Sequence, residues 1–400
     1  MKAGAPPTVI SSIVCCCRKT QPHNIHNTIV ARRRLISTYG YTQAKSLVYS
    51  EHGSPSDVLQ LHTHSISPPH TNLLTLRTLA SPLNPADINQ IQGTYATLPP
   101  FNTSLGTAQP TAVPGNEACF EVLSAGSGAK TVKTGDWVIA KHTGLGTWRT
   151  HLQVAEDRVQ KVEDRDGLSA EQAATVSVNP VTAWRMLRDF EEFKEGEWYL
   201  QNGANSGVGR AALQLGKRWG YKCIAVVRKR EREEWERLKR ELEELGASKV
   251  VTDEELVKRD FKDRVMEWTN GGREEVRLAL NCVGGDHAMA IARVMSPGGC
   301  MVTYGGMSKN PMKVGASMLI FKGFRLEGFW VSKWSDSHPE EKKRTVDALL
   351  EMIRKGEFRD VPMVKVKWDW DTKKEELVDA VQGTLEGYKK GKGIFVFGDT

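Results

Sequence analysis

The stretch WYLQNGANSGVG, residues 198–209, decides the fold of this chain. Trp198 to Gln201 reads as a short buried strand, a glycine-rich turn follows it, and a helix is expected over 210–219. Glycines in such a turn let the backbone approach a pyrophosphate, and the N-terminus of the following helix supplies amide groups and a favourable dipole. The spacing departs from G-x-G-x-x-G, so a glycine-rich turn without a function is the alternative. The order strand, turn and helix favours a dinucleotide site.

The sequence on the C-terminal side of this turn repeats the same rhythm. Further strands are expected at Cys223–Val227, Val250–Val251, Leu278–Val283 and Cys300–Tyr304, and the charged stretch Lys229–Glu244 predicts a long solvated helix. Repeated strand–helix units imply a doubly wound parallel sheet of the Rossmann type. We place this domain at residues 177–324.

The sequence on either side of that domain is different. Between 41 and 176, short apolar alternations separated by glycine and proline predict a strand-rich domain, with a helix beginning after Ser169 as its N-cap. A helix over 341–355 and a closing strand over 394–397 lie in the C-terminal segment, 325–400. The predicted fold class is therefore α/β, with a Rossmann domain inserted into a strand-rich catalytic domain.

Three cations stand where the second strand of the dinucleotide domain ends. In an NAD-specific fold this position carries an acidic residue that binds the ribose 2′-hydroxyl, but here Val227 is followed by Arg228, Lys229 and Arg230. Cations pair with a 2′-phosphate, so the sequence favours NADPH. The alternative is that these residues merely begin the charged helix.

Composition excludes several other classes. The chain has 400 residues, of which 40% are hydrophobic and 26% charged, and it contains no apolar run long enough to predict a membrane span. Its net charge is +7, but residues 1–40 hold six basic residues and no acidic one, so the remainder carries about +1. A net charge this small argues against nucleic-acid binding.

The N-terminal segment has the composition of an organellar targeting sequence. Residues 1–40 are rich in Ser, Thr and Arg and lack acids, which is typical of transit peptides. We expect a mature chain that starts around 37–42 and a location in the mitochondrial matrix; a disordered tail is the alternative. Four cysteines lie outside this segment without the close pairs of zinc or redox sites, and are expected to be buried. They are Cys119, Cys223, Cys282 and Cys300.

Taken together, these features are similar to the medium-chain dehydrogenase/reductase superfamily, and more closely resemble the mitochondrial trans-2-enoyl-thioester reductases. The resemblance extends over about residues 43–397. It rests on the segments NPADINQIQGTY (84–95), GNE (115–117), GLGTWRT (144–150), VNPVTAWRML (178–187), QNGANSGVG (201–209), NCVGG (281–285), VTYGGM (302–307) and FWVSKW (329–334).

The resemblance implies a GroES-like catalytic domain, a homodimer and a set of site residues. Tyr95 matches the catalytic tyrosine of the family. The positions that match NADPH contacts are Asn179, Asn205, Ser206, Gly207, Val208, Arg228, Lys229, Arg230, Tyr304, Gly305, Gly306, Met307, Phe329, Trp330, Val331, Ser332 and Lys392. Lys229 departs from the family, which commonly has an acid there, and Gly203 leaves the exact shape of the turn open.

The sequence lacks the residues of a catalytic zinc site, of a nucleophilic serine site and of a P-loop. Zinc-dependent relatives use Cys and His-Glu ligands, whereas the matching positions here are Asn84 and Asn116. The pair His62 and His64, at period two, predicts a solvent-facing strand edge rather than a metal site. Neither a G-x-S-x-G elbow nor a G-x-x-x-x-G-K loop occurs.

The remaining chemistry is hydride transfer to the β-carbon of a trans-2-enoyl thioester, with Tyr95 as proton donor to the α-carbon, directly or through water. The carrier is acyl carrier protein or CoA, and Lys389, Lys390 and Lys392 are candidates for docking an acidic carrier. Two other readings stay open. One is a quinone or enone reductase of the same fold, and the other is a non-catalytic nucleotide- or RNA-binding module.

Overall fold

The computed structural model describes Met1 and residues 40–385 and 391–400. Almost all of the predicted targeting segment, and the docking candidates Lys389 and Lys390, lie outside these residues. Across the described ranges, no helix is both long and apolar enough to span a bilayer.

A six-stranded parallel sheet forms the dinucleotide domain. Its order is β10 (Lys249–Thr252), β9 (Lys222–Val227), β8 (Trp198–Asn202), β11 (Val276–Asn281), β12 (Cys300–Thr303) and β13 (Arg325–Gly328). Numbered along the chain this is the order 3-2-1-4-5-6 of a doubly wound Rossmann sheet, so the predicted fold is confirmed. β13 pairs with β12, so the sheet extends one strand past the boundary that we predicted at 324/325.

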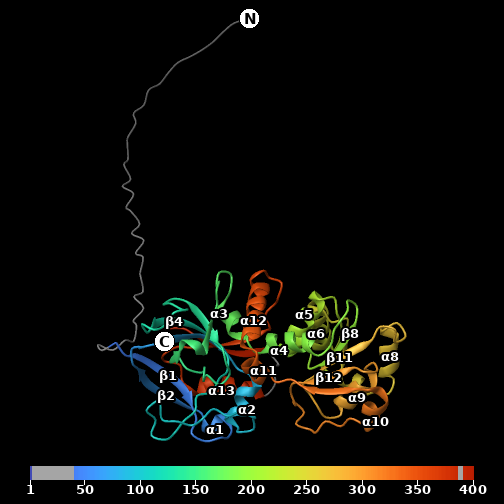
Figure 1. Cartoon of the computed structure of the whole chain (residues 1–400), viewed down its shortest axis with the longest axis horizontal. Helices are drawn as coiled ribbons and strands as arrows, with labels where there is room; N and C mark the ends of the chain where they lie inside the picture. The colour runs from blue at the N-terminus through green and yellow to red at the C-terminus, as the bar shows by residue number, and fades with distance from the viewer. Residues whose placement is uncertain (2–39, 386–390) are drawn as a thin grey trace. The chain divides into compact units, whose positions relative to one another are not determined.

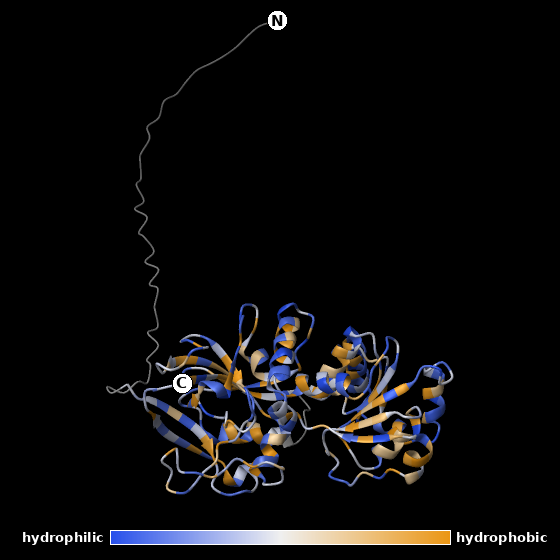
Figure 2. Cartoon of the chain, in the orientation of Figure 1, coloured by the Kyte–Doolittle hydropathy of each residue, from blue (hydrophilic) through white to orange (hydrophobic). Residues whose placement is uncertain are grey.

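Alternate residues of the strands pack on opposite faces of this sheet. Tyr199, Cys223 and Leu280 belong to one buried cluster, whereas Trp198 and Ile224 belong to another. The first face is covered by α4 (Asn179–Asp189), α5 (Gly207–Arg218) and α6 (Arg232–Leu245), and the second by α8 (Phe261–Trp268) and α9 (His287–Val294). Apolar residues recur along these strands (Figure 2), and the two clusters bury both faces of the sheet.

The strand-rich domain is built on a seven-stranded sheet of mixed direction. Its main path is β14 (Met363–Trp368), β15 (Lys392–Phe397), β3 (Leu73–Pro82), β4 (Cys119–Ala125), β5 (Trp137–Ala140) and β7 (Val159–Lys161), and β6 (His151–Ala155) also pairs with β3. A separate hairpin-like pair joins β1 (Thr42–Val48) to β2 (Gln60–Ile66). Because β15 pairs with β3, the end of the chain completes a sheet that begins before residue 80.

Helices from both parts of the chain pack on this domain. Figure 1 shows the C-terminal helix α13 (Lys374–Leu385) beside the N-terminal helices α1 (Pro55–Val58) and α2 (Pro85–Ile91), and α13 contacts both of them. The other helices of the chain are α3 (Ala170–Thr175), α7 (Asp253–Leu256), α10 (Ala316–Lys322), α11 (Val331–Ser337) and α12 (Pro339–Arg354), with a short 3₁₀ turn at Glu156–Arg158. Ser169 is the N-cap of α3, as predicted.

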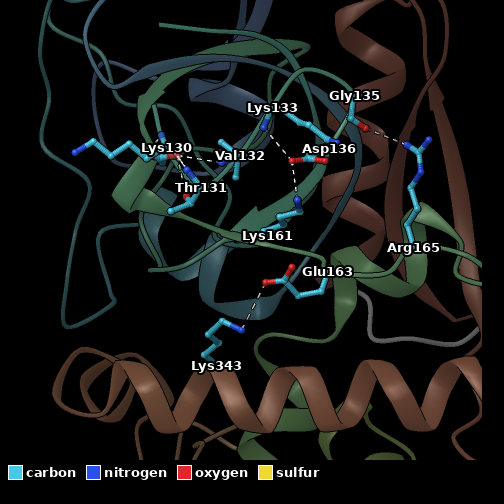
Figure 3. A network of polar contacts seen from close by, with 11 residues as sticks. Lys130, Thr131, Val132, Lys133, Gly135, Asp136, Lys161, Glu163, Arg165 and Lys343 are labelled. Atoms are coloured by element: carbon cyan, nitrogen blue, oxygen red, sulfur yellow. Dashed lines mark hydrogen bonds and ion pairs between the residues drawn. The ribbon is translucent and has the colours of Figure 1, made fainter. Parts of the chain in front are cut away.

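Polar contacts occur within the strand-rich segment 41–176 and between that segment and α12 (Figure 3). Asp136 accepts a hydrogen bond from the backbone N–H of Lys133 and pairs with Lys161 of β7 at 3.0 Å. Beyond β7, Glu163 faces Lys343 of α12 at 4.0 Å. The Glu163–Lys343 pair is exposed and contributes little energy, but it connects segments about 180 positions apart along the chain.

Two predicted features differ in the structure. α6 begins at Arg232 rather than at Lys229, because the Lys229 N–H is bound by the Asp253 carboxylate. His62 and His64 are part-buried with their rings stacked at 5.8 Å, and His62 Nε2 lies 2.9 Å from the Leu105 carbonyl oxygen, so the solvent-facing prediction is wrong. The four cysteines outside the targeting segment are buried and free, as expected.

Candidate functional site

The glycine-rich turn forms the start of α5. Ser206 caps the helix, since its hydroxyl accepts the Gly209 N–H at 3.1 Å, and this cap starts the helix three residues earlier than predicted. Gly203 has φ +61°, and a Cβ there would lie 2.4 Å from the Cys282 sulfur. A Cβ on Gly207 would lie 2.8 Å from Asn179 Nδ2. The turn therefore requires glycine, and it brings open backbone to a helix N-terminus that can hold a pyrophosphate.

The cations after β9 lie in a loop ahead of α6. Lys229 pairs with Glu254 at 2.8 Å and Arg230 with Glu234 at 3.1 Å. Arg228 is exposed, and among the described residues it makes no ion pair or side-chain hydrogen bond. These residues precede α6 rather than begin it, and the guanidinium of Arg228 is the group available for a 2′-phosphate.

The other predicted cofactor positions follow the same edge of the sheet. Asn205–Val208 come after β8, Arg228–Arg230 after β9, Tyr304–Met307 after β12 and Phe329–Ser332 after β13. Carboxyl ends of parallel strands meet at one edge, and this edge is where doubly wound sheets bind nucleotides. A cavity beside α5 is lined by Asn179, Gly207 and Lys392 among others, so the structure also brings these three together. The residues present fit NADPH, and their individual roles stay predictions.

Tyr95 lies on the loop after α2 and meets the segment that follows β13. The tyrosine hydroxyl accepts a hydrogen bond from Trp330 Nε1 at 3.0 Å, and the two rings pack edge to face at 6.1 Å. Burial raises the pKa of Tyr95, which keeps the hydroxyl protonated at neutral pH. The predicted proton donor and the predicted cofactor segment 329–332 are therefore in direct contact.

Asp87 and Asn84, at the start of the helix that precedes this loop, belong to a buried polar network that the sequence analysis did not predict. Asp87, fully buried, accepts the Asn84 N–H at 2.7 Å, and Asn84 Nδ2 donates to Glu117 at 2.8 Å. Burial raises the pKa of Asp87 to about 7 against the opposing effect of its hydrogen bonds. We considered Asn84 and Asn116 only as positions that lack zinc ligands. Their pairing with nearby carboxylates required the fold.

Lys392 supplies the positive charge inside this network. It is buried on β15, its ammonium donates to Asn84 Oδ1, and burial lowers its pKa while Glu117 and Asp87 oppose that shift. Glu117 in turn accepts the Val178 N–H at 2.8 Å, which fixes the start of α4 and so the position of Asn179. Lys392 thus lines the cavity beside α5 and also compensates buried carboxylates.

No group of three or more His, Cys, Asp or Glu side chains that could hold a metal ion occurs in the described part of the chain. At the positions of the zinc ligands, amide side chains bind carboxylates instead.

Comparison with known proteins places the chain in a family. Residues 70–164 match the alcohol dehydrogenase GroES-like domain, and residues 207–351 match the zinc-binding dehydrogenase model. The mitochondrial enoyl-[acyl-carrier-protein] reductase of Yarrowia lipolytica is 41% identical over 349 residues, which are 87% of this chain and 90% of the relative.

Solved structures agree with this comparison. The Etr1p T175V mutant in complex with NADP and crotonyl-CoA has a TM-score of 0.84 and 36% identity, covering 89% of this chain and 100% of that chain. The mitochondrial 2-enoyl thioester reductase Etr1p/Etr2p heterodimer from Candida tropicalis also has a TM-score of 0.84 and 36% identity, over 88% of this chain and 99% of that one. On its sequence and its fold, the chain belongs to the mitochondrial enoyl-[acyl-carrier-protein] reductases, a family with the alcohol dehydrogenase GroES-like domain.

Proposed function

We propose that this protein reduces trans-2-enoyl thioesters to saturated acyl thioesters with NADPH in the mitochondrial matrix, as a step of fatty acid synthesis. The observation that carries the proposal is the contact between Tyr95 and Trp330, because it joins the predicted donor to the segment after β13 at the nucleotide edge. The family membership and the relative solved with NADP and crotonyl-CoA support the same reaction.

The residues of the chain divide the work between binding and protonation. NADPH, when bound, supplies the hydride that reaches the electrophilic β-carbon of the conjugated thioester. The α-carbon then needs a proton, and Tyr95 holds one at its hydroxyl because burial raises its pKa. Trp330 Nε1 orients that hydroxyl by donating to its oxygen.

Turnover of the full protein tests the reaction. We expect NADPH oxidation, followed by absorbance of the reduced nicotinamide, to depend on added trans-2-hexenoyl-CoA and to be much slower with NADH. Quinone serves as the comparison substrate. Turnover of quinone alone would replace the proposal by a quinone reductase of the same fold, and NADPH binding without any turnover would favour a non-catalytic module.

We further propose acyl carrier protein as the natural carrier of the substrate. Of the three predicted docking cations, Lys392 is buried and bound to Asn84, so its docking role was wrong. Lys389 and Lys390, outside the described residues, are the cations that we still predict to dock this acidic partner. Reversing both to Glu should raise KM for the carrier-bound substrate roughly tenfold and leave KM for the CoA thioester within about twofold. Steady-state kinetics with both substrates measure this, and an equal change for both would remove the docking role.

We propose that the protein forms a homodimer through the outer edge of β13. All four residues of this strand are exposed, and no described strand pairs with its outer edge. On the neighbouring α10, Ile320 is 70% and Phe321 86% exposed. An unpaired strand edge beside exposed apolar side chains suits a second copy of the same chain. The Candida tropicalis relative was solved as a heterodimer of two reductase chains.

Phe321→Asp should convert the dimer to a monomer, because it places a charge in the apolar contact. Sedimentation equilibrium measures the mass in solution. Val257→Asp is the matched control, since Val257 is also an exposed apolar residue but lies after α7. A dimer that persists in Phe321→Asp, or dissociation in both variants, would contradict this interface.

A further inference from the structure

We infer that Gln90 and Asn116 are positioning residues that hold the loop of Tyr95 in place through a directed chain of buried hydrogen bonds. The chain starts at the Asp87 carboxylate, passes through the two side-chain amides and ends at the Thr97 carbonyl. This inference rests on the proposed role of Tyr95 as proton donor.

Both donor hydrogens of Asn116 are used, and its oxygen accepts a third hydrogen bond. Its Nδ2 group donates to Asp87 Oδ1 at 2.5 Å and to Gln90 Oε1 at 2.8 Å, and its Oδ1 accepts the Gly144 N–H at 2.7 Å. An amide offers two donor hydrogens and one oxygen, so no alternative orientation satisfies these partners. The side chain is buried, and a flipped amide would place its oxygen against the carboxylate of Asp87.

The orientation of Asn116 fixes that of Gln90. Because Gln90 Oε1 faces the Asn116 donor, its Nε2 group must point away, and it donates to the Thr97 carbonyl oxygen at 3.2 Å. Gln90 is the residue before the end of α2 and is itself buried, so it joins a rigid helix to the exposed loop that follows. Thr97 lies two residues after Tyr95.

The loop between these points has few other restraints. Gly93 and Thr94 are bound to the end of α2 through backbone carbonyls, while Thr94, Ala96 and Thr97 are exposed. The Gln90 bond therefore restrains the far side of Tyr95, and Trp330 restrains its hydroxyl. A displacement of a reacting group by about 1 Å can cost on the order of 10²-fold in rate, so this tether bears directly on protonation.

Gln90→Met tests the tether, and Gln92→Met is the matched control. Gln92 lies two positions along, is only part-buried, and makes no side-chain hydrogen bond within the described ranges. For Gln90→Met we expect kcat to fall roughly tenfold with KM for NADPH within about twofold, and the solvent deuterium isotope effect on kcat to rise as protonation becomes limiting. Gln92→Met should match the wild type in each measurement.

A second readout does not depend on turnover. Hydrogen–deuterium exchange of the free protein should be faster at the amides of 94–98 in Gln90→Met and unchanged in Gln92→Met. If Gln90→Met does not fold, Gln90→Glu serves, because an ionised carboxylate still accepts the Asn116 amide but cannot donate to Thr97. Unchanged exchange overturns the tether, and faster exchange with unchanged kcat overturns its role in positioning. Full turnover by Tyr95→Phe would instead refute the donor itself.

Discussion

Tyr95→Phe should lower kcat for enoyl thioester reduction at least about 10²-fold while NADPH binds as in the wild type. The substitution removes the hydroxyl group that carries the proton but keeps the ring that packs edge to face on Trp330. Its effect on folding should be small, because the lost bond is a single hydrogen bond from Trp330 Nε1.

Single-turnover kinetics with trans-2-hexenoyl-CoA and a fluorescence titration with NADPH separate chemistry from binding. Tyr41→Phe is the control, since Tyr41 is 41% exposed ahead of β1. Because burial raises the pKa of Tyr95, the wild-type rate should not decline with rising pH below the ordinary tyrosine range near about 10. A Tyr95→Phe enzyme with more than about a tenth of wild-type kcat would assign the proton to another group.

Arg228→Ala should raise KM for NADPH roughly 10- to 100-fold and leave KM for NADH nearly unchanged. Hydrogen bonds to a charged group contribute about 1.5–3 kcal/mol, and about 1.4 kcal/mol corresponds to tenfold. The 2′-phosphate is the only difference between the two cofactors, so the loss should appear with NADPH alone.

Lys229→Ala is the matched control for this prediction. The ammonium of Lys229 is exposed and already paired with Glu254, so its removal should change KM for NADPH by less than about threefold. Initial rates give KM for NADPH and for NADH in each of the two variants. Equal losses with NADPH and NADH, or a larger effect at Lys229 than at Arg228, would contradict the assignment of the 2′-phosphate to Arg228.

Features that depend on near neighbours in the chain could be predicted from the sequence. The strand before Gly203, the turn and the helix after it follow from the apolar pattern and the glycines within a few residues of one another, although the Ser206 cap starts the helix earlier than predicted. The sequence also indicated the place of the cations after Val227, because they follow a strand of a parallel sheet and such strands all end at one edge. The residues around Tyr95 do not by themselves indicate a role for it, and the predicted role came from the resemblance to the enoyl-thioester reductases.

The tertiary structure alone decided which side chains meet. Tyr95 and Trp330 are 235 positions apart, and Lys392 and Asn84 are 308 apart, so no local pattern predicts either contact. The start of α6 also depended on Asp253, a residue of another strand–helix unit. A periodic sequence records which face of an element is apolar, whereas a buried polar group is stable only when a particular distant partner satisfies it. For this reason the sequence by itself determined the fold class and the cofactor type, while only the tertiary structure decided the buried polar network of Asp87, Asn84 and Lys392.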